Sequence, residues 1–288
     1  MAYHSLESIT AYCKEHGTSF YEAVLADDRE ERDTTAEESL SRMAVLWDTM
    51  KETDASYDAA LRSSSGLSGG QGARMEAYGK QGGGYCSPFM NAVMQTALKT
   101  AESNACMRRI VAAPTAGSCG VMPAVLIPAA KEWGFSDQKM IESLYVAAGI
   151  GQVAAERAYI AGASGGCQAE IGTASAMAAG ALVYLKDGTP EQICDAAAIA
   201  LKSLLGLVCD PVAGLVEVPC VKRNVLGAVN ALTSADMALA GIKSFVPADQ
   251  VLDAMKEVGD KMDHSLKETG AGGLAASRAA KELNDHSS

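Results

Sequence analysis

The sequence is poor in the features that mark several common protein classes. Aromatic side chains make up only 5% of the 288 residues, so an aromatic-rich β-sandwich is not expected. The net charge of −11 lacks the basic excess that attracts nucleic acid or an anionic membrane. The apolar runs, such as residues 174–185, are too short to span a bilayer. What remains is a chain that is 48% apolar and rich in alanine and glycine, which suits closely packed buried helices.

An export signal and a zinc-ligand pattern are also missing. Residues 1–5 contain no basic stretch followed by an apolar one, so we expect a cytoplasmic protein without a disulfide framework. No Cys-x-x-Cys pair occurs, which leaves a structural zinc site poorly supported. The histidines lie near the chain ends, away from the central cysteines: His4, His16, His264 and His286.

Helical periodicity recurs along almost the whole chain, and strict alternation is nearly absent. Ser19 and Glu22 match a capping box, as do Thr189 and Gln192. We therefore predict a mainly α fold, a single compact all-helical catalytic domain over residues 1–288 with glycine-rich active-site loops. The expected helices are 5–16, one opening at Ser19, 35–61, 88–105, 123–133, 136–160, 171–186, 189–208, 221–243 and 248–263.

Two short motifs suggest nucleotide binding but lack the context it requires. LSGGQ at 67–71 spells the signature of ABC-type ATPases, which also need a Gly-rich loop ending in Gly-Lys-Ser/Thr. GIGQVA at 149–154 loosely matches the dinucleotide fingerprint, which requires a strand before it. Because this second motif lies inside a helical pattern, its glycines are better explained by close helix packing.

A Gly/Ser-rich segment at residues 63–84 has two readings, a flexible linker or a loop that binds an anion. In the second reading, exposed main-chain N–H groups and serine hydroxyls hold a carboxylate. TAGS at 115–118, just before an expected helix, poses the same choice, because a helix N-terminus also attracts anions.

Three cysteines, Cys167, Cys209 and Cys220, each lie in a Gly- or Pro-marked break between apolar helical runs. Each alone is most simply a buried thiol, as Cys13, Cys106 and Cys194 are expected to be. Three soft ligands near helix ends also suit iron–sulfur chemistry. A cluster held by three cysteines would leave one iron open to act as a Lewis acid, although spacing alone does not identify the cluster.

Several motifs in order closely resemble the α chain of bacterial iron–sulfur L-serine dehydratase. The resemblance covers nearly the whole chain, and several independent motifs make it specific. The motifs are SSSGLSGGQG at 63–72, APTAGSCGVMPAV at 113–125, GGCQAEIG at 165–172, CDPVAGLVEVPC at 209–220 with KRN at 222–224, and KETGAGGLA at 267–275.

The resemblance implies an L-serine ammonia-lyase that converts L-serine to pyruvate and ammonia. It implies a helical catalytic domain, an oxygen-sensitive 4Fe–4S cluster held by Cys167, Cys209 and Cys220, and a separate β chain as partner. Some relatives carry a further cysteine at the extreme C-terminus. This chain ends in NDHSS at 284–288, so we expect water at the fourth iron.

The hypothesis for the mechanism is that the open iron binds the serine hydroxyl while a base removes the α-proton. The base is left open: a nearby lysine or serine, or a residue of the β chain. The substrate loop is expected at 63–84 and the cluster-binding region at 165–224. The candidates for holding the substrate carboxylate are Ser64, Ser65, Gly66 and Thr115, with Arg223 and Asn224 as weaker ones.

Three other functions reach similar chemistry or use similar ligands. A pyridoxal-phosphate dehydratase needs a Schiff-base lysine on an α/β scaffold, for which Lys80 and Lys222 are unconvincing. A related cluster-dependent lyase acting on cysteine would release sulfide. A redox sensor with a labile cluster would need a partner- or DNA-binding surface that the acidic sequence does not offer.

Overall fold

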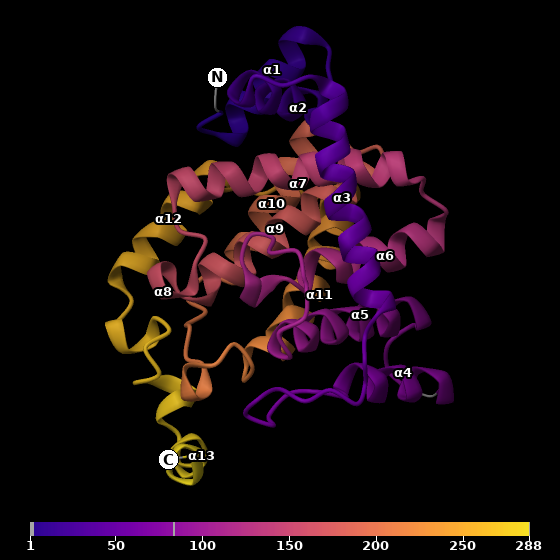
Figure 1. Cartoon of the computed structure of the whole chain (residues 1–288). Coiled ribbons are helices and arrows are strands. Elements are labelled where there is room, and N and C mark those ends of the chain that lie inside the picture. Colours follow the sequence, from indigo (N-terminus) through magenta and orange to yellow (C-terminus); the bar gives the residue numbers. More distant parts are fainter. Residues whose placement is uncertain (1–2, 83, 288) are drawn as a thin grey trace.

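The computed structural model describes residues 3–82 and 84–287, and over this part of the chain it is built of helices (Figure 1). No strand occurs in these residues, and the one β-type pairing is an isolated bridge between Cys209 and Lys267. The mainly α fold is therefore confirmed. The α-helices are α1 (Leu6–His16), α2 (Phe20–Arg32), α3 (Ala36–Ala55), α4 (Gln71–Gln81), α5 (Pro88–Ala105), α6 (Val121–Trp133), α7 (Asp137–Arg157), α8 (Gly162–Gly165), α9 (Cys167–Leu185), α10 (Pro190–Lys202), α11 (Cys220–Leu239), α12 (Ala248–Lys261) and α13 (Arg278–Ser287).

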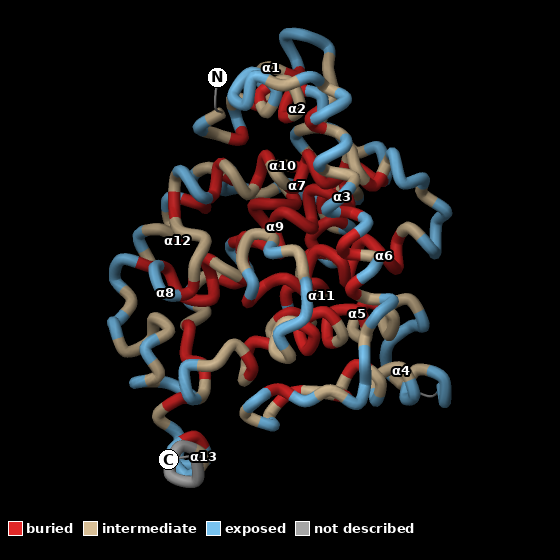
Figure 2. The backbone as a smooth tube through the Cα atoms, in the orientation of Figure 1, coloured by how far each residue is buried: buried red, intermediate tan, exposed pale blue. Residues whose placement is uncertain are grey.

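Helix α9 lies at the centre of the molecule and packs against α7, α10 and α11. Every residue of α9 except Glu170 is buried, because small residues such as alanine and glycine let its neighbours approach on all sides. Figure 2 shows the buried backbone concentrated on these helices, with exposed backbone at the periphery. Full burial of a side chain such as Ile171 contributes about 1.5–3 kcal/mol, so α9 is a main source of stability.

The glycines at 149–154 lie within α7 and pack closely against other helices. A Cβ atom at Gly149 would come within 2.5 Å of Val24, and one at Gly151 would meet Met177 at 3.0 Å. The motif is therefore part of a helix–helix contact, as predicted, and not a strand-to-helix turn.

The predicted helix starts at Ser19 and Thr189 are confirmed. In each, the side chain of the capping residue accepts a hydrogen bond from the N–H three residues on. The side chain of Glu22 or Gln192 in turn accepts the N–H of the capping residue. These caps satisfy main-chain N–H groups that would otherwise lack a partner.

The structure corrects the expectation that residues 63–84 form one loop. Among the described residues of this segment, 63–70, Gly82 and Gly84 are irregular, and α4 occupies Gln71–Gln81 between them. The Ala, Arg, Met and Glu residues of α4 are good helix formers, and the carboxylate of Glu102 accepts the N–H groups of Gln71 and Gly72 at its start. This tertiary cap is not visible in the local sequence.

Several other helix boundaries differ from the expected ones; α7 ends at Arg157 and not at 160, and α11 ends at Leu239 and not at 243. Helix α3 ends at Ala55 and not near residue 61, where the Asp58 side chain accepts the N–H of Ala60 and forms a turn. Helix α10 ends at Lys202 and not near 208. Helix α9 begins at Cys167 and not at 171, so Cys167 and Glu170 lie in its first turn. Helix α13 was not expected.

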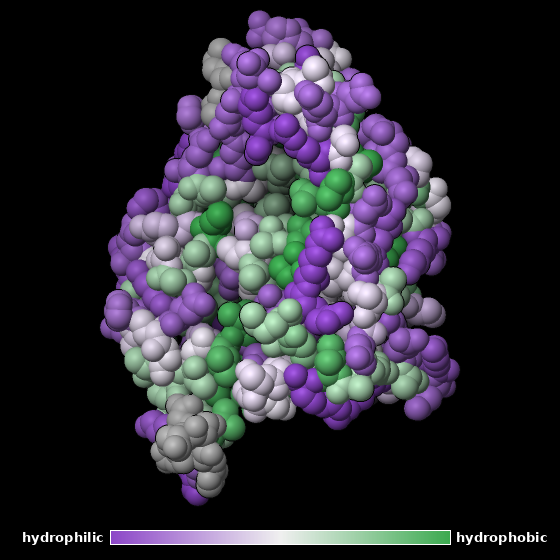
Figure 3. Space-filling model, in the orientation of Figure 1, coloured by the Kyte–Doolittle hydropathy of each residue, from purple (hydrophilic) through white to green (hydrophobic). Residues whose placement is uncertain are grey.

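The view in Figure 3 shows hydrophilic side chains along the flanks of the molecule and apolar ones gathered toward the middle of this face. Within the described residues, no helix combines the length and the apolarity needed to cross a bilayer. Residues 1–2, Gly83 and Ser288, which entered the expectations about export, the Gly/Ser segment and the chain end, lie outside the described residues, as do the side chains of 284–287.

Candidate functional site

The three singled-out cysteines are all buried and lie at helix starts or in a loop. Cys167 is the first residue of α9 and Cys220 the first residue of α11, while Cys209 follows α10. Cys209 is held in place by main-chain hydrogen bonds to the C-terminal segment: its N–H donates to Leu266, and its carbonyl accepts the N–H of Glu268. Two of these thiols therefore sit at the positive end of a helix dipole, which favours negative charge.

Two of the three thiols converge with a carboxylate. The sulfur atoms of Cys167 and Cys209 and a carboxylate oxygen of Glu170 all lie within 4.8 Å of one another. Cys220 is outside this group, at the start of α11, one turn before the Arg223 whose guanidinium donates to Cys167 Sγ. Burial first, and then the charges of Cys167 and Glu170, raise the pKa of Cys220 to about 12. The structure thus brings Cys167 and Cys209 together, while Cys220 is connected to them through Arg223 on the same helix.

Arg223, one turn after Cys220 on α11, reaches into the same region. Its guanidinium donates to Cys167 Sγ at 3.2 Å, to the Val208 carbonyl at 2.7 Å and to Asp210 at 2.8 Å. The hydrogen bond from Cys209 and then the positive charge of Arg223 lower the pKa of Cys167, although burial opposes them. The same thiol–thiol bond, with burial, raises the pKa of Cys209. Cys167 is therefore the thiol that this surrounding favours as a thiolate.

Thr115 binds the Glu170 carboxylate directly. Its hydroxyl donates to Glu170, and the main chain at Gly117 lies so close that a Cβ there would be 2.5 Å from a Glu170 oxygen. Burial raises the pKa of Glu170; the Thr115 hydrogen bond opposes this, and the negative charge of Glu268 adds to it. The turn at 115–118 is thus packed against the acid that faces the sulfurs.

Asn224 is buried, and its amide is used by the main chain. Its oxygen accepts the N–H of Gly120 at 2.8 Å, and its nitrogen donates to the carbonyls of Gly117 and Cys220 at 2.8 and 2.9 Å. Since both N–H bonds are taken, Asn224 fixes the 115–120 turn to the start of α11 in this structure.

The C-terminal glycine motif, residues 267–275, packs against Asp210 of the 209–220 loop. Asp210, paired with Arg223 on one oxygen, accepts the N–H of Leu274 on the other at 2.8 Å. A Cβ at Gly273 would lie 2.4 Å from that oxygen, so the chain approaches as closely as it does only because glycine is present. Likewise, a Cβ at Gly162 would lie 2.6 Å from the sulfur of Cys209.

Glu217 connects the irregular residues 63–70, called here the Gly/Ser turn, to the 209–220 loop, which carries Cys209 and Cys220. Its two carboxylate oxygens accept the hydroxyls of Ser63 at 2.6 Å and Ser65 at 2.9 Å. Glu217 is 5% exposed and lies between Cys209 and Cys220 in the chain. Ser64 and Gly66, by contrast, are exposed, and Gly66 has a left-handed φ of 76°.

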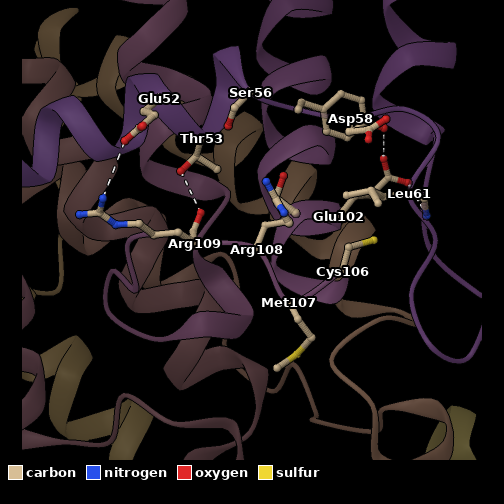
Figure 4. A pocket seen from close by; sticks show the side chains of 13 residues that line it. Glu52, Thr53, Ser56, Asp58, Leu61, Glu102, Cys106, Met107, Arg108 and Arg109 are labelled. Carbon is tan, nitrogen blue, oxygen red and sulfur yellow. Dashed lines mark hydrogen bonds and ion pairs between the residues drawn. The ribbon is translucent and has the colours of Figure 1, made fainter.

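A second buried carboxylate, Glu102, holds the other end of this turn. It accepts the N–H groups of Gly69, Gln71 and Gly72 and the hydroxyl of Tyr57. Glu102 also lines a cavity of about 410 Å³ that has Arg109 on its opposite side (Figure 4). None of the three site cysteines lines this cavity, so it is separate from the thiol site.

Sequence reasoning found the thiols and missed the acids around them. Glu170 lies three residues after Cys167, which places both on one face of α9; the signal was hidden because the helix was expected to begin later. Glu102 and Glu217 bind the turn from 31 and 154 residues away, a pairing that no local pattern reveals.

Fold and site together define an all-helical protein with buried thiols and a carboxylate at helix N-termini, a ligand set suited to soft metal ions or an iron–sulfur centre. A family profile described as "Serine dehydratase alpha chain" matches residues 15–275. The chain therefore belongs to the serine dehydratase alpha chain family.

Individual relatives agree with this assignment. The chain is 43% identical to the "Probable L-serine dehydratase, alpha chain" of Bacillus subtilis (strain 168), over 98% of this chain and 94% of that protein. It is 44% identical to the "L-serine dehydratase, alpha chain" of Peptoniphilus asaccharolyticus, over 94% and 93%. An "L-serine dehydratase" of Streptomyces coelicolor is 46% identical over 62% of this chain but only 40% of its own length.

Proposed function

We propose that this chain is the catalytic chain of an L-serine dehydratase, which converts L-serine to pyruvate and ammonia. Family membership and the names of the relatives support the reaction. The observation that carries the proposal is spatial: motifs from four separate parts of the chain are connected to Cys167, directly or through the 209–220 loop. They are the Gly/Ser turn through Glu217, the 115–118 turn through Glu170, the 209–220 loop, and the C-terminal motif through Asp210.

We further propose that Cys167, Cys209 and Cys220 hold a 4Fe–4S cluster. Two observations support the fit: the sulfurs of Cys167 and Cys209 converge, and Arg223, one turn after Cys220, donates a hydrogen bond to Cys167 Sγ. Donors of this kind orient thiolate ligands and tune their basicity. When bound by three thiolates, the cluster supplies an open iron that acts as a Lewis acid toward the substrate hydroxyl.

The Gly/Ser turn would bind the substrate carboxylate. Ser64 is exposed, and its hydroxyl and N–H have no hydrogen-bond partner in the described part of the chain. Left-handed Gly66 directs the turn so that such groups converge on an anion. Thr115 and Arg223 lie at the thiol site, and in this structure each already binds another group: Thr115 binds Glu170, and Arg223 binds Cys167 and Asp210.

Glu170 is an acid that faces the sulfurs of Cys167 and Cys209, with a carboxylate held by Thr115. Burial favours its protonated form, so its carboxyl can hold a proton next to a departing hydroxyl group. For removal of the α-proton we propose a base from a separate β chain. The names of the alpha-chain relatives support a partner of this kind. The isolated α chain is then expected to bind the cluster but to turn over poorly.

The test is anaerobic reconstitution of iron and sulfide into the α chain, followed by assay of pyruvate from L-serine with and without the β chain. We expect an iron-loaded protein whose pyruvate formation depends on the β chain. An iron-free protein with full activity would overturn the cluster proposal. Equal specific activity without the β chain would overturn the proposal about the base. Faster release of sulfide from L-cysteine than of pyruvate from L-serine would reassign the substrate.

A further inference from the structure

We propose that Glu217 is a positioning residue that fixes the Gly/Ser turn through Ser63 and Ser65, and that Ser64 is the serine of this turn that contacts the substrate. The part about substrate rests on the proposed function above. The part about Glu217 concerns only this chain and stands without it.

The contacts of Glu217 connect two segments that are far apart in sequence. Its carboxylate belongs to the 209–220 loop, whose ends carry Cys209 and Cys220, and it binds one serine hydroxyl with each oxygen. Hydrogen bonds from hydroxyl groups to a buried carboxylate are stronger than those between neutral groups. The position of the turn is therefore set by the loop that also sets two of the cysteines.

The same two serines organise the turn internally. Ser63 Oγ accepts the N–H of Ser68, and Ser65 Oγ accepts the N–H of Leu67, both at 3.1 Å. Each hydroxyl thus donates its single proton to Glu217 and accepts from the main chain of the turn. A hydroxyl has only one proton to donate, so Ser65 has none left for a substrate carboxylate.

Ser64 differs from its two neighbours in this respect. Its side chain is exposed and, among the described residues, has no hydrogen-bond partner. The hydroxyls of Ser63 and Ser65 therefore bind Glu217 and fix the turn, while the hydroxyl of Ser64 between them is exposed to solvent. Sequence alone placed Ser64 and Ser65 in the same role.

Glu102 provides an internal reference for testing this role. It binds the N–H groups of Gly69, Gln71 and Gly72, whereas the Glu217 network supports those of Leu67 and Ser68. Loss of the Glu217 contacts should loosen the second group and leave the first unchanged.

The first experiment is residue-resolved hydrogen–deuterium exchange on the α chain without cluster or partner. In Glu217→Gln, we expect exchange at Leu67 and Ser68 to rise by at least about fivefold, with Gly69 and Gly72 unchanged. The Ser63→Ala/Ser65→Ala double variant removes the same bonds without altering the 209–220 loop, and it must show the same pattern. Glu142→Gln is the matched control, because Glu142 accepts a hydroxyl from Tyr184 far from the turn.

Unchanged exchange at Leu67 and Ser68 in the serine double variant would overturn the positioning role, even if Glu217→Gln does not fold. A uniform rise across 66–72 would do the same, because it would indicate general loosening of the fold.

The second experiment is kinetic and uses the reconstituted α chain with its β chain. Glu217→Gln and Ser65→Ala should each raise KM for L-serine about tenfold with kcat within about threefold, and combining them should add little more. Ser65→Thr keeps the hydroxyl and should stay within about threefold of the wild-type KM. Ser64→Ala should also raise KM, and combining it with Glu217→Gln should add little more, because Glu217 acts on the substrate by positioning the turn that carries Ser64.

Multiplying effects of Ser65→Ala and Glu217→Gln would overturn the assignment, because Ser65 would then act on the substrate by a separate route. If the wild-type protein makes no pyruvate at all, the proposed function fails, while the exchange experiment still decides the role of Glu217.

Discussion

The helical core around α9 and the thiol site at its N-terminal end are both buried, but they are stabilised in different ways. In the core, apolar side chains and small residues pack against each other. In the site, nearly every buried group has a specific polar partner, such as Arg223 with Asp210 and Thr115 with Glu170. Burial alone therefore does not distinguish a functional region of this protein from a structural one.

The cysteines show the difference most directly. Burial raises the pKa of Cys194 to about 12; a hydrogen bond with Thr10 opposes this only in part, and the negative charges of Asp249 and Asp195 add to it. Cys167 is more fully buried than the partly buried Cys194, yet its pKa is lowered, because a Cys209 hydrogen bond and the charge of Arg223 stabilise its thiolate. Partners rather than exposure determine which thiol can act as a ligand.

The largest expected effect comes from removing the site thiols. Cys167→Ala, Cys209→Ala and Cys220→Ala should each lower pyruvate formation by at least about 100-fold and reduce bound iron, because each removes a proposed cluster ligand. Iron content and pyruvate after anaerobic reconstitution with the β chain are the measurements.

Cys119→Ala is the sharpest control for these variants. Cys119 is buried near the site, and burial, followed by the charge of Glu170, raises its pKa to about 12. We expect this variant to keep its iron. Loss of iron in Cys119→Ala but not in Cys220→Ala would replace one proposed ligand with another.

The next largest effect is a loss of stability when the ion pair between Arg223 and Asp210, beside Cys167, is broken. Arg223→Gln leaves Asp210 buried without its charge partner, and the two side chains are only 13% and 5% exposed. Breaking such a pair should lower the free energy of unfolding by about 3 kcal/mol, as measured by urea denaturation. Arg157→Gln, which removes an ion pair to the half-exposed Asp253, should cost less than about 1 kcal/mol. Equal losses would mean that the site pair is no different from a surface one.

Within the core, packing geometry should determine whether a glycine-to-alanine substitution raises or lowers the free energy of unfolding. Gly149→Ala forces a methyl group to within 2.5 Å of branched Val24, whereas in Gly151→Ala the neighbour is the flexible end of Met177. Both gain helix propensity, by up to about 1 kcal/mol. We expect Gly149→Ala to lose about 1 kcal/mol, because overpacking outweighs the gain, and Gly151→Ala to be neutral or more stable. Thermal and urea unfolding of the two variants would show whether the signs differ.

The sequence was sufficient to predict most helices, because periodicity and capping boxes such as Ser19 with Glu22 are local signals. It also singled out Cys167 and Cys209, which the structure brings together. Helix α4 was missed, because its start is capped by Glu102 from another helix. Glu170 and Glu217 were missed for a related reason: their importance depends on which segments meet in three dimensions, and that information is not present in any window of the chain.

The smallest expected effect is a pH dependence of stability caused by Cys194, a thiol outside the proposed site. Since the folded-state pKa of Cys194, about 12, lies above the ordinary cysteine value of about 8.5, folding favours its neutral form. Its contribution to stability is therefore fully present below about pH 8 and is lost as pH rises through the alkaline range. At pH 9 this one thiol should account for a loss of about 0.8 kcal/mol relative to neutral pH. Cys194→Ala should remove that part of the decline, while Cys86→Ala, at an exposed position, should leave the decline unchanged. Urea unfolding of the wild type and the two variants at pH 7 and pH 9 measures this decline in the free energy of unfolding. An identical decline in all three proteins would mean that burial of Cys194 does not disfavour its thiolate.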